Sequence, residues 1–267
     1  MVQEKKSIVR EKICAGNWKM YKTPDETTAY FQEFSKIKRA NLENANSKNV
    51  KIIFFPPAYN LLVVKSFAEE LSFSFGPQNI HFEKEGAFTG ENSATAAKLL
   101  GASYALIGHS ERRTLFQETD MIVAKKMQCA AECGLLPMLC VGETLPERES
   151  DRTSEVVLKQ LKIGLSQVLN EISSGKTLPV VAYEPVWAIG TGKVATPEQA
   201  EQVHSFIRQS LGELVGSERA QSISILYGGS VKPDNAAGLA IQPNIDGFLV
   251  GGASLKPKDF AAISAAL

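Results

Sequence analysis

The sequence predicts an α/β protein in which eight strand and helix units close into one (β/α)8 barrel. Three observations carry this prediction: eight apolar runs have the length of strands, helix-favouring stretches lie between them, and 267 residues are available. Barrels of this kind take about 250 residues as one domain. Regular alternation with short connections predicts parallel strands and right-handed crossovers. An open, doubly wound sheet and a pair of smaller domains are the alternatives.

The expected strands are mostly apolar at consecutive positions rather than at alternate ones. Consecutive apolar residues are typical of parallel strands that are covered on both faces. The eight strands are expected at residues 12–18, 50–55, 72–76, 103–108, 136–141, 178–183, 222–228 and 245–251.

Two helices between these strands have clear start signals. Thr23 and Glu26 form a capping box with proline at the first helical position, and Thr196 and Gln199 repeat this arrangement. Further helices are expected at residues 57–70, 93–100, 117–133, 153–173, 234–240 and 257–266. No linker rich in proline, glycine or serine divides the chain, so we expect one barrel domain over residues 12–267. Residues 1–11 are expected to be a polar, frayed extension.

Composition excludes several classes of protein. With 44% hydrophobic and 22% charged residues, the chain has the composition of a soluble globular protein. Basic and acidic residues number 29 each, so no broad attraction to nucleic acid or to a membrane is expected. The N-terminus lacks the apolar core of a signal peptide, and no segment reaches the length of a membrane span. We therefore expect a cytoplasmic protein.

The cysteines and histidines do not have the spacing of a metal site. The chain contains three histidines, and its four cysteines form no CxxC element. Buried free thiols in a reducing compartment are expected, and a bound transition metal is not. The cysteines are Cys14, Cys129, Cys133 and Cys140.

Polar residues follow several of the expected strands. In a closed barrel the loops after the strands gather at one end, where the active sites of such barrels lie. The residues in question are Asn17 and Lys19 after the first strand, His109, Ser110 and Glu111 after the fourth, and Glu184 after the sixth. Glycine pairs follow the last two strands, at 228–229 and 251–252. Barrels bind phosphate there through backbone N–H groups, so a small phosphorylated substrate is inferred.

Each of these residues also has a purely structural interpretation. A glutamate at a strand end is commonly solvated or salt-bridged, a lone histidine is often a core residue, and a glycine pair is often a tight turn. Pro185, however, holds Glu184 extended after a buried strand. A carboxylate held stiffly beside apolar groups is expected to have a raised pKa, near that of a useful base. A nucleophilic serine is weakly supported because GxSxG is absent.

Seven motifs together resemble the triosephosphate isomerase family, in the family's order and spacing, from about Lys12 to the C-terminus. They are AGNWKM (15–20), GAFTGE (86–91), IGHSERR (107–113), CVGET (140–144), AYEPVWAIGTGKVAT (182–196), YGGSV (227–231) and VGGASL (250–255). The resemblance implies a TIM barrel and a cofactor-free isomerase of glycolysis and gluconeogenesis. Such an enzyme interconverts dihydroxyacetone phosphate and D-glyceraldehyde 3-phosphate through an enediolate.

The resemblance also implies roles for individual residues. Glu184 is implied to be the general base, His109 the neutral electrophile, and Lys19 the cation that stabilises the enediolate. Asn17 is implied to donate a hydrogen bond to the substrate, and Glu111 to orient the lysine. The phosphate is implied to bind the backbone N–H groups of Gly190, Ser230, Gly251 and Gly252.

The apolar loop PVWAIGTGKVA after Glu184 resembles the lid of this family. Residues 188–192 are implied to be the tip that closes over the phosphate and expels water. The implied hinges are Pro185, Val186 and Trp187 on one side and Lys193, Val194 and Ala195 on the other.

The resemblance further implies a homodimer, with the loop that carries Thr89 reaching into a second subunit. Asn92 and Ala96 depart from the family's usual apolar and larger residues, which leaves the tightness of the dimer open. Two alternative functions remain: another phosphosugar isomerase or lyase on the same barrel, and a catalytically silent phosphate-binding barrel.

Overall fold

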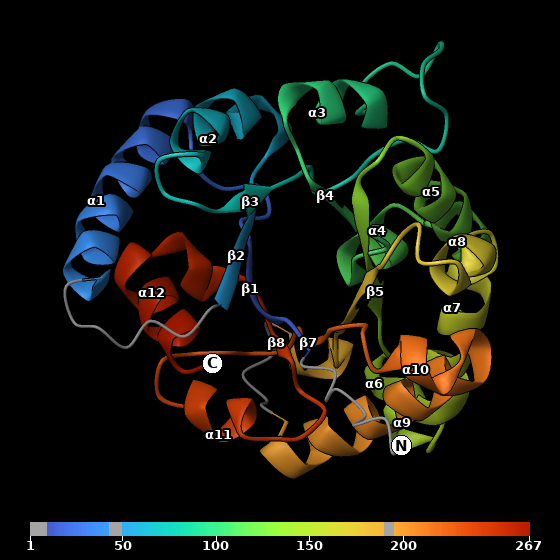
Figure 1. Cartoon of the computed structure of the whole chain (residues 1–267). Coiled ribbons are helices and arrows are strands. Elements are labelled where there is room, and N and C mark those ends of the chain that lie inside the picture. The colour runs from blue at the N-terminus through green and yellow to red at the C-terminus, as the bar shows by residue number, and fades with distance from the viewer. Residues whose placement is uncertain (1–9, 43–49, 190–194) are drawn as a thin grey trace, which may run out of the picture.

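The computed structural model describes residues 10–42, 50–189 and 195–267. Within them, eight parallel strands form one sheet, and helices surround it (Figure 1). The order of neighbours runs from β3 through β2 and β1 to β8, and then from β7 back to β4. The strands are β1 (Lys12–Asn17), β2 (Val50–Phe55), β3 (Ser74–Phe75), β4 (Tyr104–Ile107), β5 (Leu136–Val141), β6 (Val180–Tyr183), β7 (Ile225–Tyr227) and β8 (Gly247–Val250).

Individual hydrogen bonds join β3 to β4, the two edge strands of the sheet. The N–H of Ser103 donates to the carbonyl of Phe75, and the N–H of Leu106 donates to the carbonyl of Pro77, each at 3.0 Å. Gly76 lies at this seam, where a Cβ atom would come within 1.9 Å of the carbonyl oxygen of Tyr104. Only glycine allows so close an approach of two backbones. The predicted closed (β/α)8 barrel is confirmed, and the open sheet is excluded.

Helices cover the outside of the barrel. The longer ones are α1 (Pro24–Leu42), α2 (Leu61–Ala68), α3 (Ala94–Leu100), α5 (Asp120–Glu132), α7 (Thr153–Leu165), α9 (Pro197–Val215) and α12 (Pro257–Ala265). The shorter ones are α4 (Ser110–Leu115), α6 (Leu145–Glu149), α8 (Leu169–Ser173), α10 (Ser217–Ala220), α11 (Ala236–Ala240) and the 3-10 helices η1 (Ala58–Asn60), η2 (Val186–Ala188) and η3 (Gly252–Leu255). Both predicted capping boxes are present, since the backbone N–H groups of Thr23 and Thr196 donate to the side chains three residues on. In the described part of the chain, no helix is long and apolar enough to cross a membrane.

Some elements differ from the sequence-based expectation. The helix expected at 153–173 is two helices, because the chain turns after Leu165, where the N–H of Val168 bonds the Leu165 carbonyl at 2.9 Å. Helices α4, α6 and α10 were not expected. The start of α6 has a signal, since the carboxylate of Glu147 accepts from the N–H of Thr144 at 2.8 Å, as in a capping box.

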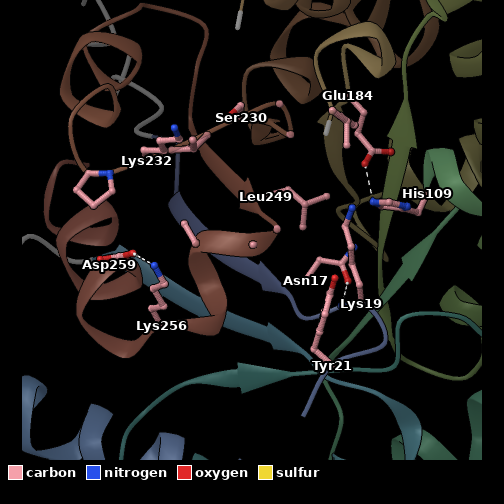
Figure 2. Close-up of a pocket in the computed structure, with 18 of the residues that line it drawn as sticks. Asn17, Lys19, Tyr21, His109, Glu184, Ser230, Lys232, Leu249, Lys256 and Asp259 are labelled. Atoms are coloured by element: carbon pink, nitrogen blue, oxygen red, sulfur yellow. Dashed lines mark hydrogen bonds and ion pairs between the residues drawn. The ribbon is translucent and has the colours of Figure 1, made fainter. Parts of the chain in front are cut away.

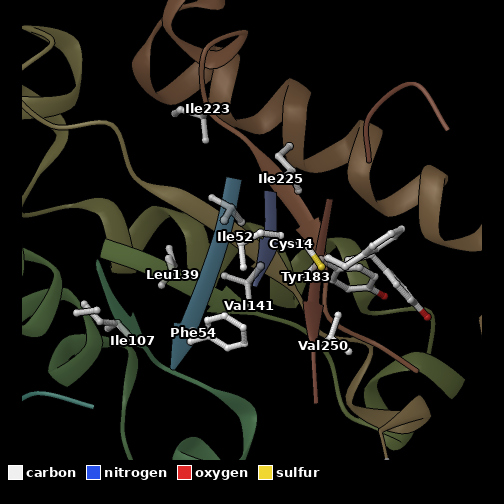
Figure 3. Packing of buried hydrophobic residues seen from close by; sticks show 14 of the residues in the cluster. Cys14, Ile52, Phe54, Ile107, Leu139, Val141, Tyr183, Ile223, Ile225 and Val250 are labelled. Carbon is white, nitrogen blue, oxygen red and sulfur yellow. The ribbon is translucent and has the colours of Figure 1, made fainter. Parts of the chain in front are cut away.

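Alternate strand residues face the two sides of the barrel wall, and both sides are buried. One set fills the barrel interior, including Ile13, Phe55 and Leu226. The other set packs against the helices, including Phe54, Leu139 and Tyr183 (Figure 3). This double burial explains why the strands are apolar at consecutive positions. All four cysteines are free; Cys133 is half-buried and the other three are buried.

Asp246, just before β8, binds two arginines from distant parts of the chain. Its Oδ2 accepts from Arg208 at 2.5 Å and its Oδ1 accepts from Arg10 at 2.6 Å. The Arg208 side chain is 7% exposed and that of Arg10 is 23% exposed. Asp246 therefore neutralises the buried guanidinium of Arg208 at the end of the barrel where the strands begin.

Asp246→Ala should lower the free energy of unfolding by about 3–5 kcal/mol, because it leaves the Arg208 charge buried and unpaired. Arg10→Ala removes the more exposed partner and should cost about 0–1 kcal/mol. Urea unfolding followed by circular dichroism measures both. An equal loss of unfolding free energy in the two variants would contradict the view that Arg208, rather than Arg10, is the buried charge that Asp246 neutralises.

Candidate active site

The carboxyl ends of the strands surround a cavity of 660 Å³ (Figure 2). Nine strand-end residues that the sequence singles out line it, although they come from five different strand ends. They are Asn17, Lys19, His109, Glu184, Gly228, Gly229, Ser230, Gly251 and Gly252. The barrel therefore brings together residues that lie up to 235 positions apart in the sequence.

Glu184 follows β6 directly and is 2% exposed. Its Oε2 accepts from the backbone N–H of Ser110 at 2.9 Å, and its Oε1 lies 2.8 Å from Nε2 of His109. Gly228 packs against it so closely that a Cβ there would lie 3.0 Å from Cγ of Glu184. The carboxylate is thus fixed at the cavity wall by two hydrogen bonds and by packing.

His109 follows β4 and caps the N-terminus of α4. Its Nδ1 accepts from the backbone N–H of Glu111 at 3.2 Å. Because Nδ1 acts as the acceptor, the neutral ring carries its proton on Nε2, and we assign the tautomer on that basis. The Nε2–H group points toward Glu184 (Figure 2). His109 can therefore donate a hydrogen bond inside the cavity while it remains neutral.

The pKa values of this pair depend on their mutual contact. Burial raises the pKa of Glu184, but the neighbouring His109 and the N–H of Ser110 lower it by more, so it lies below its ordinary value. Burial is the largest single influence on the pKa of His109 and lowers it, but the charge and hydrogen bond of Glu184 and the charge of Glu111 together raise it by more, so it lies above its ordinary value. The neutral ring is assigned from geometry, because the N–H of Glu111 occupies the position at Nδ1 that a second proton would take. The expectation of a raised pKa for Glu184 is wrong for this arrangement, because it counted apolar surroundings and not the two donors.

Lys19 occupies a strained backbone position at the end of β1, with φ of 50°. Two side chains hold the turn: Oδ1 of Asn17 accepts from the N–H of Lys19 at 3.0 Å, and Gln78 donates to its carbonyl at 2.8 Å. Nζ of Lys19 lies 2.5 Å from Oε1 of Glu111. The ammonium is therefore aimed into the cavity by a carboxylate outside it. Gln78 has no motif that marks it in the sequence.

The turns after β7 and β8 form a further part of the cavity wall. Asn235 fixes the first turn by donating to the carbonyl of Ser230 at 3.0 Å. Ser254 fixes the second by donating to the carbonyl of Gly251 through both its N–H and its hydroxyl. Helix η3 begins at Gly252. Loops after the last two strands together with a short helix are the usual phosphate site of such barrels.

The segment after Glu184 is anchored to Glu143, a residue that the strand-end reasoning missed. Glu143 is fully buried and accepts from Nε1 of Trp187 at 2.9 Å and from the hydroxyl of Tyr183 at 3.1 Å. Its carbonyl also accepts from the N–H of Val186 at 3.1 Å. The sequence did contain a signal that could have identified Glu143, because this residue belongs to the CVGET motif after β5.

Not all predicted site residues lie in the cavity or in the described residues. Gly190, Lys193 and Val194 lie outside the described residues. Thr89 is exposed and lies away from the cavity, in the loop before α3. That loop is braced by His81, whose ring stacks on Phe88 with centroids 3.9 Å apart. Within the described ranges, no group of three histidines, cysteines or acids could hold a metal ion.

Comparisons with known proteins point to one family. The family model described as triosephosphate isomerase matches residues 12–267. The chain is 51% identical to the triosephosphate isomerase of Bdellovibrio bacteriovorus, over 95% of this chain and 99% of that protein. It is 49% identical to the triosephosphate isomerase of Solibacter usitatus, over 96% of this chain and 99% of that protein. It is 48% identical to that of Carboxydothermus hydrogenoformans, over 96% of this chain and 98% of that protein.

Proposed function

The chain belongs to the triosephosphate isomerase family, and we propose that Glu184, His109 and Lys19 carry out the reaction of that family in this protein. The enzyme is an isomerase that acts on triose phosphates. The observation that carries the proposal for the residues is the 2.8 Å contact between Glu184 and His109, in a cavity that also contains Lys19. A base, a neutral donor and a cation around one small space suit proton transfer beside a carbonyl.

Glu184 is proposed to remove the proton from one carbon of dihydroxyacetone phosphate and to return it to the neighbouring carbon. One carboxylate can serve both carbons, so no cofactor is needed. Its pKa lies below the ordinary value, which keeps it ionised at neutral pH. To act, it must leave the N–H of Ser110 and turn into the cavity, because its oxygens now face Ser110 and His109.

His109 and Lys19 are proposed to stabilise the enediolate that forms in between. Negative charge develops on the substrate oxygens, and the Nε2–H of His109 becomes free to donate to them when Glu184 turns into the cavity. Nε2–H of His109 provides the hydrogen bond and the ammonium of Lys19 provides the charge. Asn17 is proposed to donate to the same oxygens, and Glu111 to position Lys19 through the 2.5 Å ion pair.

The phosphate is proposed to bind the turns after β7 and β8, through the N–H groups of Ser230, Gly251 and Gly252. Ser230, Gly251 and Gly252 line the same cavity as Glu184. Gly190, outside the described residues, is proposed as a further donor. A phosphate held there fixes the distance between the reacting carbons and the base.

The proposal is tested by following both triose phosphates in coupled assays with the purified protein. Rapid interconversion without added metal or cofactor is expected. Absence of that activity would favour one of two other functions. Solvent isotope exchange into other sugar phosphates would indicate a different isomerase or lyase, and phosphate binding without exchange would indicate a silent barrel.

The segment after Glu184 is proposed to act as a lid, with Pro185, Val186, Trp187 and Ala195 among its hinges. Replacing residues 188–192 by a short glycine linker should lower kcat by about 10²-fold, because the base and phosphate lose their alignment. It should also raise the elimination of inorganic phosphate relative to isomerisation, because water reaches the enediolate. A phosphate release assay beside the coupled assay gives the ratio, and an unchanged ratio would refute the lid.

The protein is proposed to form a homodimer in the cytoplasm, as a glycolytic enzyme. Phe88, beside Thr89, is 41% exposed, and Met20 and Tyr21, which follow β1, are 88% and 57% exposed. Exposed apolar side chains of this kind mark interaction surfaces. Separation of cell fractions tests the compartment.

Thr89→Arg should weaken the dimer by about 10² to 10³-fold, because the interface would then bury an unpaired charge. Sedimentation velocity over a range of concentrations measures the shift to monomer. Thr28→Arg, on α1, is the matched control and should leave the association unchanged. A dimer of undiminished strength in Thr89→Arg would place the interface elsewhere.

A further inference from the structure

A second polar cavity, of 460 Å³, lies on the outside of the barrel between α6, the start of α7 and α9. Its polar lining consists mainly of Arg148, Asp151, Ser154, Gln202, Ser205 and Gln209. None of these residues belongs to the catalytic cavity. The polar lining contains one cation, one carboxylate, and otherwise hydroxyl and amide groups, and Val203 and Phe206 add apolar side chains.

Two lining residues of this cavity reach the buried carboxylate behind the active site. NH1 of Arg148 and the hydroxyl of Thr153 each lie 3.4 Å from Oε1 of Glu143. The same oxygen accepts from Nε1 of Trp187 at 2.9 Å. The Arg148 guanidinium also lies over the Trp187 ring, 5.1 Å from its centroid. The cavity is thus connected, through Arg148 and Glu143, to the segment that follows Glu184.

We propose that this outer cavity binds a small hydroxylated organic anion, and that its occupation displaces the segment that carries the base. The anionic group would bind Arg148, and hydroxyl groups would bind Asp151 and the glutamine amides. The effect on turnover rests on the proposed role of Glu184, whereas binding does not.

The geometry of Arg148 supports an anionic ligand. A guanidinium has five N–H donors, and the contact to Glu143 uses one of them at a long 3.4 Å. The Arg148 side chain is 25% exposed, so its remaining donors are accessible from the cavity. A carboxylate or phosphate binds arginine through two bonds of about 2.7–2.9 Å. Such a ligand therefore competes with Glu143 for the guanidinium.

The consequence for the active site follows from the burial of Glu143. Its carboxylate is fully buried, and Arg148 is the cation beside it. When Arg148 turns to a ligand, the negative charge of Glu143 loses the nearby positive charge that offsets it. The hydrogen bond from Trp187 to Glu143 is then disturbed. The carbonyl of Glu143 also holds the N–H of Val186, two residues from the base. We expect a less well placed Glu184 and a lower kcat.

The first test measures binding by the change in tryptophan emission. Trp187 lies against Arg148 and should respond, whereas Trp18, the second of the chain's two tryptophans, is buried in the core and should contribute a constant background. The probes are gluconate, which is a hydroxylated carboxylate, glucose 6-phosphate, and uncharged glucose. The two anions should change the emission saturably in the millimolar range, and glucose should not. The relative strength of the two anions distinguishes a carboxylate site from a phosphate site.

Gln202→Glu places a second carboxylate in the cavity without touching Arg148 or Glu143, and should abolish the response. Gln32→Glu, an exposed position on α1, is the matched control and should retain it. Both variants should keep the basal activity. An unchanged emission with both anions, or an equal response in Gln202→Glu, would overturn the proposal.

The second test measures kinetics at several concentrations of glyceraldehyde 3-phosphate. Saturating gluconate should lower kcat by about five-fold or more, an effect that excess substrate does not reverse. This effect should also disappear in Gln202→Glu. Inhibition that excess substrate reverses fully would show binding in the catalytic cavity instead, and binding with an unchanged kcat would refute the coupling. If the protein isomerises no triose phosphate, only the kinetic test fails, and the fluorescence test still decides whether the site exists.

Discussion

Glu184→Gln should lower kcat by a factor of about 10² to 10⁴, the usual contribution of a general base. Glutamine has nearly the shape of glutamate, but it cannot accept the proton. The amide fills the same space, but its single oxygen can accept from only one of the two donors, the N–H of Ser110 or the Nε2–H of His109. One contact is therefore lost, while the walls of the cavity should remain in place. The affinity for glycerol 3-phosphate, which carries the phosphate but cannot isomerise, should stay within about three-fold of the wild type.

Steady-state kinetics and calorimetric titration with glycerol 3-phosphate measure the two effects separately. Glu147→Gln is the matched control, because Glu147 caps α6 and lies outside the catalytic cavity. That variant should lose a little stability and retain kcat. If Glu184→Gln lost binding and turnover equally, the residue would have a structural role and the base would lie elsewhere.

The barrel could be predicted from the sequence because its physical requirements are local and repeated. A strand buried on both faces must be apolar at nearly every position, and a helix start needs few residue types, as at Thr23 and Thr196. Lengths were less accurate. The third strand was expected over five residues and has two. At the seam with β4 a regular ladder gives way to individual bonds, in which the carbonyls of Phe75 and Pro77 accept from the N–H groups of Ser103 and Leu106.

The positions of the candidate site residues followed from the barrel, since each comes directly after a strand. Placing Glu184, His109 and Lys19 in one cavity needed only the rule that strand ends converge. Their roles rest on chemistry and on the family, and they stay predictions until variants are measured.

The pKa of Glu184 could not be predicted in the same way. Its direction depends on the N–H of Ser110 and on Nε2 of His109, which lie more than 70 positions away in the sequence. The same holds for Gln78, which braces the strained Lys19 from the loop after β3. Interactions between distant segments become visible only when the barrel is closed.

His109→Gln should lower kcat by about 10² to 10³-fold, which corresponds to the loss of one well-placed donor, about 2.7–4 kcal/mol. The imidazole is oriented by the N–H of Glu111 on Nδ1, so its Nε2–H points at a fixed position. A glutamine amide has donors but lacks this orientation. Binding in the ground state should change little, because the donor matters most when charge develops on the substrate oxygen.

The infrared carbonyl band of bound dihydroxyacetone phosphate tests the same role without reference to rate. A hydrogen bond from Nε2 polarises the carbonyl and lowers its stretching frequency in the wild type, and the shift should disappear in His109→Gln. His81→Gln, in the loop that carries Thr89, is the control and should retain both the shift and kcat when the dimer is intact. If His109→Gln kept the lowered frequency, Lys19 or Asn17 would be the polarising group. The rate loss would then come from the altered contact with Glu184, whose Oε1 now lies 2.8 Å from the ring.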